Sequence, residues 1–258
     1  MRVKANLSHK IIWIFLVITM AVSAVEISSI GQAIDTAGKQ RMLSYRILKD
    51  YVMLSMESEY KDPKKSMEES LKTFKESEAA LVRYVKDTEI QSLFSEVEKN
   101  FAVMKMMISN PFKKTEGEEY LRKTIKLKSA SHQIVLALQK KSGKKSTEIL
   151  NKIGGLRAIS QKINAIYLLK TMGVTSDFIE KSMKDTMIIF ADTLDSLGKA
   201  ELASAEMQKK LTKMKKIYRF FQVMNESDNY VPTIVSKKSS KMLKYANELT
   251  KLYINTIK

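Results

Sequence analysis

Residues 37–46 of the chain read AGKQRMLSYR, and residues 153–162 read IGGLRAISQK. Aligned without a gap, 116 positions apart, the two stretches share the frame Gly-x-x-Arg-x-x-Ser-x-basic. The match is informative because arginine is scarce here: three of the seven arginines lie inside these two stretches. The repeated stretch therefore predicts a chain built from two related units.

Apolar residues recur at intervals of three and four along nearly the whole chain, which is typical of amphipathic helices. The same offset of 116 also aligns Phe74 with Phe190 and Leu81 with Leu197. We expect an all-α fold of antiparallel helical bundles, with about four helices in repeat 1 (25–142) and four in repeat 2 (143–258). Asp62-Pro63 and Asn110-Pro111 mark helix boundaries in the first repeat. The helices expected in the second span 146–173, 175–198, 200–225 and 232–258. The sequence leaves open whether they build one mixed bundle or two separate bundles.

The N-terminal segment has the pattern of an export signal. Arg2, Lys4 and Lys10 form a basic region, and the uncharged stretch 11–25 follows with small residues around Ala24. We therefore expect a signal peptide over 1–24 and a location in the periplasm. The alternative is an uncleaved segment that anchors the protein in the inner membrane.

The composition argues against several classes of function. The chain has no cysteine and two histidines, one of them within the expected signal, so a zinc site, a cysteine nucleophile or a histidine-based triad is not expected. We predict that the protein is not an enzyme and has no cofactor or metal. The net charge of +17 would suggest nucleic acid in a cytosolic protein. For an exported chain we expect no nucleic acid; the charge would attract anionic lipid, surface polymers or small anions, or simply form solvated lysine faces.

Each copy of the repeated frame places an arginine on the inward-facing stripe of its helix. A glycine lies one turn before the arginine and a serine one turn after it. A buried guanidinium needs an anion or a set of acceptors, and a mid-helix glycine is commonly retained where something approaches closely. Such a recess would suit a planar oxyanion, because guanidinium donates paired N–H groups in one plane. The candidate ligand-binding residues are Gly38, Arg41, Ser44, Gly154, Arg157 and Ser160.

A purely structural interpretation of the same residues stays open. Arg41 would then pair with a carboxylate such as Glu57, Glu69 or Glu76, Gly38 would only permit close helix packing, and Ser44 would bond its own backbone. His132 is interpreted as an ordinary residue of a polar helix face.

Residues 34–46 resemble the P-box of NarX/NarQ-type nitrate sensors. They are still more similar to the corresponding segment of PilJ-type sensor domains, named after type IV pili methyl-accepting chemotaxis transducers. The resemblance implies an extracytoplasmic helical bundle in which Gly38 and Arg41, and by repeat Gly154 and Arg157, hold a small anion. It also implies that the two arginines approach one ligand from opposite sides. The second copy departs from the box at Ala158 and Lys162, which makes its role less certain.

Together these observations favour an exported sensor or binding module for a small anion, with nitrate, nitrite or a carboxylate as the first candidates. No signalling output module follows the repeats in this sequence, so we expect the state of the sensor to pass to a partner such as a membrane receptor or a kinase. A homodimer is left open. The alternative is a helical scaffold or interaction protein at the envelope that keeps the sensor fold without a ligand.

Overall fold

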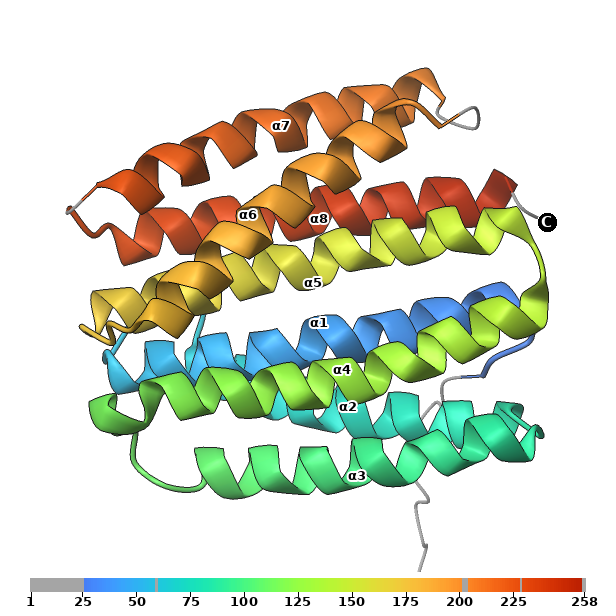
Figure 1. Ribbon diagram of the computed structural model, residues 1–258, viewed down its shortest axis with the longest axis horizontal. Coiled ribbons are helices and arrows are strands. Elements are labelled where there is room, and N and C mark those ends of the chain that lie inside the picture. Colours follow the sequence, from blue (N-terminus) through green and yellow to red (C-terminus); the bar gives the residue numbers. More distant parts are fainter. Residues whose placement is uncertain (1–25, 59, 201–203, 228, 257–258) are drawn as a thin grey trace, which may run out of the picture.

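The computed structural model describes residues 26–58, 60–200, 204–227 and 229–256, and this part of the chain is all-α, as predicted (Figure 1). One 3₁₀ turn, η1 (Lys114–Glu116), precedes the fourth helix. The α-helices of the described residues are α1 (Ile30–Ser55), α2 (Pro63–Tyr84), α3 (Thr88–Ile108), α4 (Gly117–Ser142), α5 (Lys145–Thr171), α6 (Asp177–Gly198), α7 (Ala205–Glu226) and α8 (Pro232–Thr256).

Local sequence signals explain where these helices begin and end. The Ser29 hydroxyl accepts a hydrogen bond from the Gln32 amide at the start of α1, and the Asp62 carboxylate caps α2 just before Pro63. At the other end, Gly143 and Gly173 follow α4 and α5 with φ values of 62° and 74°. Glycine adopts this left-handed conformation without steric cost, so it ends a helix readily.

The helices form two groups of four that lie against each other. α1 contacts α2 and α4, and α3 contacts α4; α5 contacts α6 and α8, and α7 contacts α6 and α8. The groups meet mainly where α1 packs along α5, and the predicted division at 142/143 falls in the short turn between α4 and α5. Because each helix runs back along the one before it, α1 and α5 run in the same direction (Figure 1).

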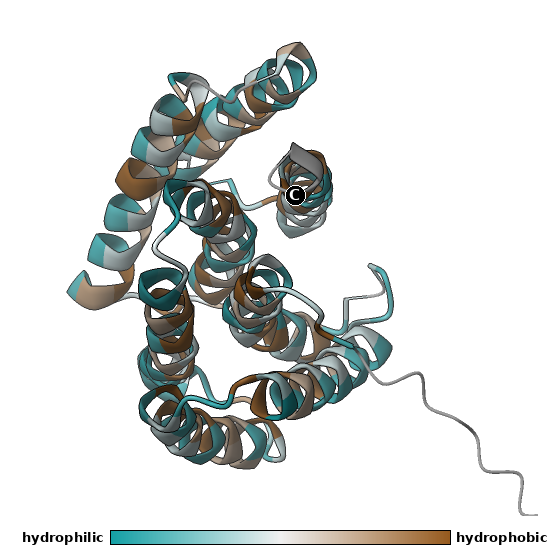
Figure 2. Cartoon of the chain, turned by 90° about the vertical axis from the view of Figure 1, so that its right-hand side faces the viewer, coloured by the Kyte–Doolittle hydropathy of each residue, from teal (hydrophilic) through white to brown (hydrophobic). Residues whose placement is uncertain are grey.

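α1 and α5 are the most enclosed helices of the molecule. Residues 40–45 of α1 and 163–169 of α5 are buried without interruption, although a helix at a surface buries only one stripe. Viewed along the helices, the apolar faces of both groups turn toward one another (Figure 2). This central position explains why even the polar residues of the repeated stretches become buried.

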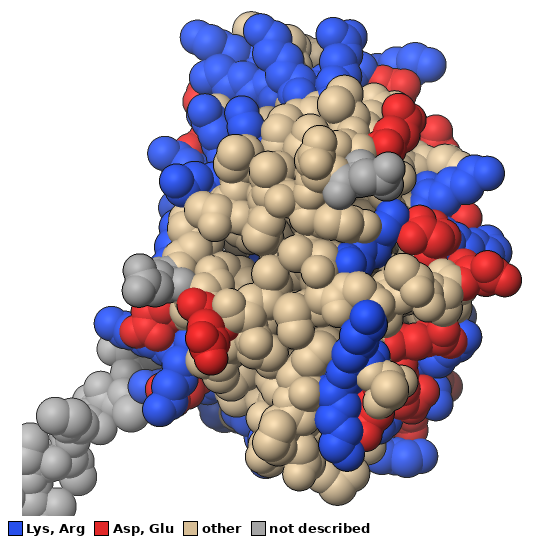
Figure 3. Space-filling view, turned by 90° about the vertical axis from the view of Figure 1, so that its left-hand side faces the viewer, with Lys and Arg blue, Asp and Glu red and all other residues tan. Residues whose placement is uncertain are grey.

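Charge is distributed unevenly over the surface. Figure 3 shows Lys and Arg gathered at the top of one end of the molecule, over α7. That helix carries six basic residues against two acidic ones. Among the described residues, no helix has an apolar stretch of the length that a bilayer crossing requires. The expected signal peptide over 1–24 lies outside the described residues.

Candidate functional site

The two repeated stretches meet halfway along the contact between α1 and α5. A methyl group built on Gly154 would stand 2.9 Å from Nη2 of Arg41 and 3.4 Å from Nη2 of Arg157. One built on Gly38 would stand 3.2 Å and 3.5 Å from the same two atoms. Both guanidinium groups therefore occupy the space that the missing side chains of the glycines leave between the helices.

Both arginines are almost completely buried, with 3% of Arg41 and 4% of Arg157 exposed. Burying a guanidinium is costly unless its donors find acceptors. Nη2 of Arg157 donates to Oδ1 of Asp35 at 2.5 Å, which forms an ion pair across the interface. The Nε atom of each arginine is buried and has no hydrogen-bond partner within the described part of the protein.

Arg41 has neutral partners instead of a carboxylate. Its Nη1 donates to Oδ1 of Asn151 at 2.7 Å and lies 2.9 Å from Nδ1 of His132, and its Nη2 donates to the backbone carbonyl of Asn151 at 3.3 Å. Because guanidinium can only donate, Nδ1 of His132 must accept, so the imidazole is neutral with its proton on Nε2.

The two sets of contacts follow the repeat. Asp35 and Asn151 occupy equivalent positions at the offset of 116, as Arg41 and Arg157 do. Each arginine reaches back toward the N-terminus of its helix and across to the other helix. Arg41 of α1 contacts Asn151 of α5, and Arg157 of α5 contacts Asp35 of α1. One of these partners is a carboxylate and the other an amide. The charge of Arg157 is thus balanced, whereas that of Arg41 is not.

A recess of about 240 Å³ opens beside Arg41. Four helices contribute to it, α1 and α4 from the first group and α5 and α6 from the second. A methyl group on Gly155 would meet no atom within 4 Å, so this glycine leaves one wall open. The lining residues are Arg41, Tyr45, Lys128, His132, Asn151, Lys152, Gly155, Ala158, Ile159, Lys162, Thr186, Ile189 and Thr193.

The electrostatic environment of the recess disfavours positive charge. Burial, together with the charge of Arg157, lowers the pKa of Arg41 to about 9, although Asp35 opposes the shift. Burial lowers the pKa of Lys128 to about 8, with further contributions from Arg41 and Lys162. Burial also lowers the pKa of Lys162, against the attraction of Asp185. An anion that enters the recess would relieve this crowding of positive charge.

The structure brings Gly38, Arg41, Gly154 and Arg157 together, and of the six predicted residues only Arg41 lines the recess. Arg157 points to Asp35 instead. The Ser44 hydroxyl donates to the carbonyl of Gln40 at 2.9 Å, and the Ser160 hydroxyl to the carbonyl of Arg157 at 2.7 Å. Both serines therefore bond their own helices, as the structural interpretation expected for Ser44. Glu57, Glu69 and Glu76, the carboxylates considered as partners of Arg41, form no ion pair with it in the described structure. Arg157 forms an ion pair with a carboxylate, that of Asp35.

Among the recess residues that sequence reasoning did not select as ligand-binding are Lys128, His132, Asn151 and Lys162. The interpretation of His132 as an ordinary polar-face residue is wrong, because its ring is half-buried against Arg41. The available signal was the i, i+4 spacing that places Lys128 and His132 on one face of α4. A second signal was the alignment of Asp35 with Asn151 at the offset of the repeat.

Comparison with known families finds a similarity within the first group of helices. Residues 26–126 match the family described as PilJ, Type IV pili methyl-accepting chemotaxis transducer N-term. The match includes Gly38 and Arg41 on α1 and ends within α4, before α5 begins. This segment is therefore similar to the sensory N-terminal region of chemotaxis transducers. No curated protein and no solved structure matches the chain.

The ion pair between Arg157 and Asp35 gives a stability prediction. Asp35→Asn keeps an acceptor but leaves a second uncompensated guanidinium beside Arg41. Because the Asp35 side chain is 28% exposed, we expect a loss of about 1–3 kcal/mol in the free energy of unfolding, below the range for a fully buried pair. Urea unfolding followed by circular dichroism measures it. Asp195→Asn, at an exposed pair with Lys215, is the matched control and should change stability little. Equal losses in the free energy of unfolding for Asp35→Asn and Asp195→Asn would show that the buried ion pair stabilises the protein no more than the exposed one.

His132 gives a prediction for pH. Burial, with the charges of Arg41 and Lys128, lowers its pKa from 6.5 to about 4. Between pH 6.5 and about pH 4, the His132 imidazole is therefore protonated in the unfolded chain and neutral in the folded protein. The contribution of the neutral imidazole to the free energy of unfolding is present above pH 6.5 and is lost as the pH falls toward 4. We expect the difference in the free energy of unfolding between the wild type and His132→Gln, measured from unfolding curves, to shrink as the pH falls over this interval. A difference independent of pH would mean that the imidazole is not held neutral.

Proposed function

We propose that the protein is a sensor module that binds a small planar anion in the recess beside Arg41, with nitrate and nitrite as first candidates. The similarity of residues 26–126 to the sensory region of chemotaxis transducers supports a sensing role. One observation carries the choice of ligand: Arg41 is buried and faces an amide where the equivalent arginine faces a carboxylate. A bound anion would supply the negative charge that Asp35 supplies to Arg157.

The other groups in the recess fit a ligand of this kind. Lys128 and Lys162 add positive charge from α4 and α5. Guanidinium presents paired N–H groups in one plane, which match two oxygens of nitrate, nitrite or a carboxylate. The volume of about 240 Å³ limits the site to a small molecule.

The recess also offers a means of transmission. Its walls come from both groups of helices, so a bound anion would tie α1 and α4 to α5 and α6. Binding would shift the protein toward whichever arrangement of the two groups places Arg41 and the lysines best around the ligand. In this proposal the protein is exported to the periplasm, and a membrane receptor or kinase reads that arrangement.

Substitution of Arg41 tests the proposal. We expect Arg41→Gln to weaken the binding of nitrate and nitrite at least tenfold, because the uncompensated guanidinium that lines the recess is removed. Helicity and thermal stability should be kept or slightly raised, since the variant loses a buried charge that has no counter-ion. Isothermal titration calorimetry measures affinity, and thermal unfolding with and without nitrate gives an independent readout.

The matched control is Arg219→Gln, which removes the same charge from an exposed position of α7. It should bind as the wild type does. A wild-type protein that shows no response to nitrate, nitrite or a panel of small carboxylates would contradict the proposal. That outcome would favour the helical scaffold, which the basic surface of α7 supports as a second candidate (Figure 3).

A further inference from the structure

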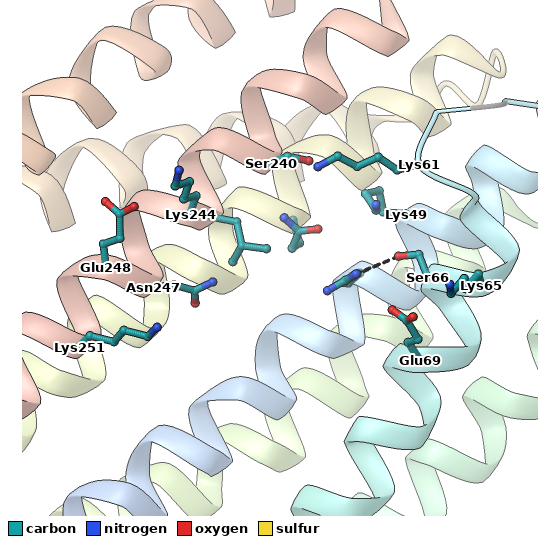
Figure 4. A pocket seen from close by; sticks show the side chains of 13 residues that line it. Lys49, Lys61, Lys65, Ser66, Glu69, Ser240, Lys244, Asn247, Glu248 and Lys251 are labelled. Carbon is teal, nitrogen blue, oxygen red and sulfur yellow. Dashed lines mark hydrogen bonds between the residues drawn. The ribbon is translucent and has the colours of Figure 1, made fainter.

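A second cavity of about 480 Å³ lies between α1, α2 and α8, on the other side of the contact between α1 and α5 (Figure 4). We call it the α1–α8 groove. Its lining residues are Arg46, Lys49, Lys61, Lys65, Ser66, Glu69, Gln161, Ser240, Leu243, Lys244, Asn247, Glu248 and Lys251. Neither arginine of the buried pair is among them.

The groove is the counterpart of the Arg41 recess under the repeat. Four residues of the groove align with four residues of the recess at the offset of 116: Arg46 with Lys162, Gln161 with Tyr45, Lys244 with Lys128, and Glu248 with His132. The helices correspond as well, because α2 and α8 take the places of α6 and α4. The groove is thus a second copy of one architectural feature, and its basic positions 46 and 244 match basic positions of the first copy.

A buried network holds the inner wall of the groove in place. The Asp50 carboxylate, 1% exposed, accepts a hydrogen bond from the Ser66 hydroxyl at 2.7 Å and pairs with Lys49 at 2.5 Å. Nη2 of Arg46 donates to Oγ of Ser66 at 3.0 Å, and its Nε lies 3.7 Å from Asp50. The guanidinium is therefore positioned by the protein before any ligand arrives.

The charge of the groove is strongly positive. Six of its lining residues are basic and two, Glu69 and Glu248, are acidic. Glu248 is already paired with Lys210, outside the groove. Of the six basic side chains that line the groove, four form no ion pair within the described residues: Lys61, Lys65, Lys244 and Lys251. They come from both sides of the groove, Lys61 and Lys65 from the α2 side and Lys244 and Lys251 from α8 (Figure 4).

We propose that the α1–α8 groove binds a multiply charged oxyanion, either a phosphorylated or a polycarboxylate small molecule, and that this site is distinct from the Arg41 recess. Several ammonium groups around a volume twice that of the recess suit a ligand with several separated negative charges better than a single nitrate. Such a ligand would bridge Lys65 of the first group of helices and Lys244 of the second.

Calorimetric titration of the full chain with inorganic pyrophosphate and with citrate tests the proposal. We expect at least one probe to bind, and Lys65→Gln with Lys244→Gln to weaken its affinity at least tenfold. The matched control, Lys64→Gln with Lys241→Gln, removes the same two charges from neighbouring exposed positions of α2 and α8 and should change affinity less than twofold. Binding of pyrophosphate alone assigns a phosphorylated ligand, and binding of citrate alone assigns a polycarboxylate.

Three results would overturn the inference. They are the absence of binding for both probes, equal losses in the two double variants, and loss of pyrophosphate or citrate binding in Arg41→Gln. The second would mean that overall charge alone attracts the anion, and the third would place the anion in the recess. Retained binding of these probes by Arg41→Gln, whatever its response to nitrate, supports a separate site.

Discussion

Two guanidinium groups share one buried space between α1 and α5, and within the described residues that of Arg157 forms an ion pair with a carboxylate, whereas that of Arg41 does not. Like charges in a medium of low polarity repel strongly, so this contact is stable only if each group finds acceptors and the helices leave room for both. Gly38 and Gly154 provide the room, and Asp35 balances the charge of Arg157. In the described part of the chain, the side chains that hydrogen-bond to Arg41 are those of Asn151 and His132. The uncompensated charge at Arg41 is the property on which the remaining features of the site depend.

The alignment of the two halves at an offset of 116 residues relates both the symmetric and the asymmetric features of the site. Because α1 and α5 run in the same direction, equivalent residues lie level with one another and each arginine crosses to the other helix. The same relation produces a cavity on either side, the Arg41 recess and the α1–α8 groove. The difference between a carboxylate at 35 and an amide at 151 gives the two arginines different electrostatic roles. The lysines that border each cavity then determine what kind of anion would suit it.

Much of the fold could be predicted from the sequence because the controlling signals are local. Apolar spacing, Asp62-Pro63 and Gly173 all act within one or two turns of a helix, and the predicted helices agree with the observed ones to within a few residues. The arginines and glycines could be named because they stand out within one stretch. The partners of Arg41 could not be named, since His132 comes from α4 and Asn151 from α5, and only the packing of three helices brings them together. The alignment of Asp35 with Asn151 is visible in the sequence, but it does not say which residue contacts which arginine. The structure shows that each arginine crosses to the other helix.

Exchange of the amide at 151 for a carboxylate measures the central claim most directly. Asn151→Asp would give Arg41 the counter-ion that Arg157 already has, so the folded protein should be more stable than the wild type and its affinity for nitrate should fall at least tenfold. Calorimetric titration with nitrate, with the exposed change Asn229→Asp as the control, gives the answer. Wild-type affinity for nitrate in Asn151→Asp would contradict the account, because it would show that the uncompensated charge of Arg41 does not bind the anion.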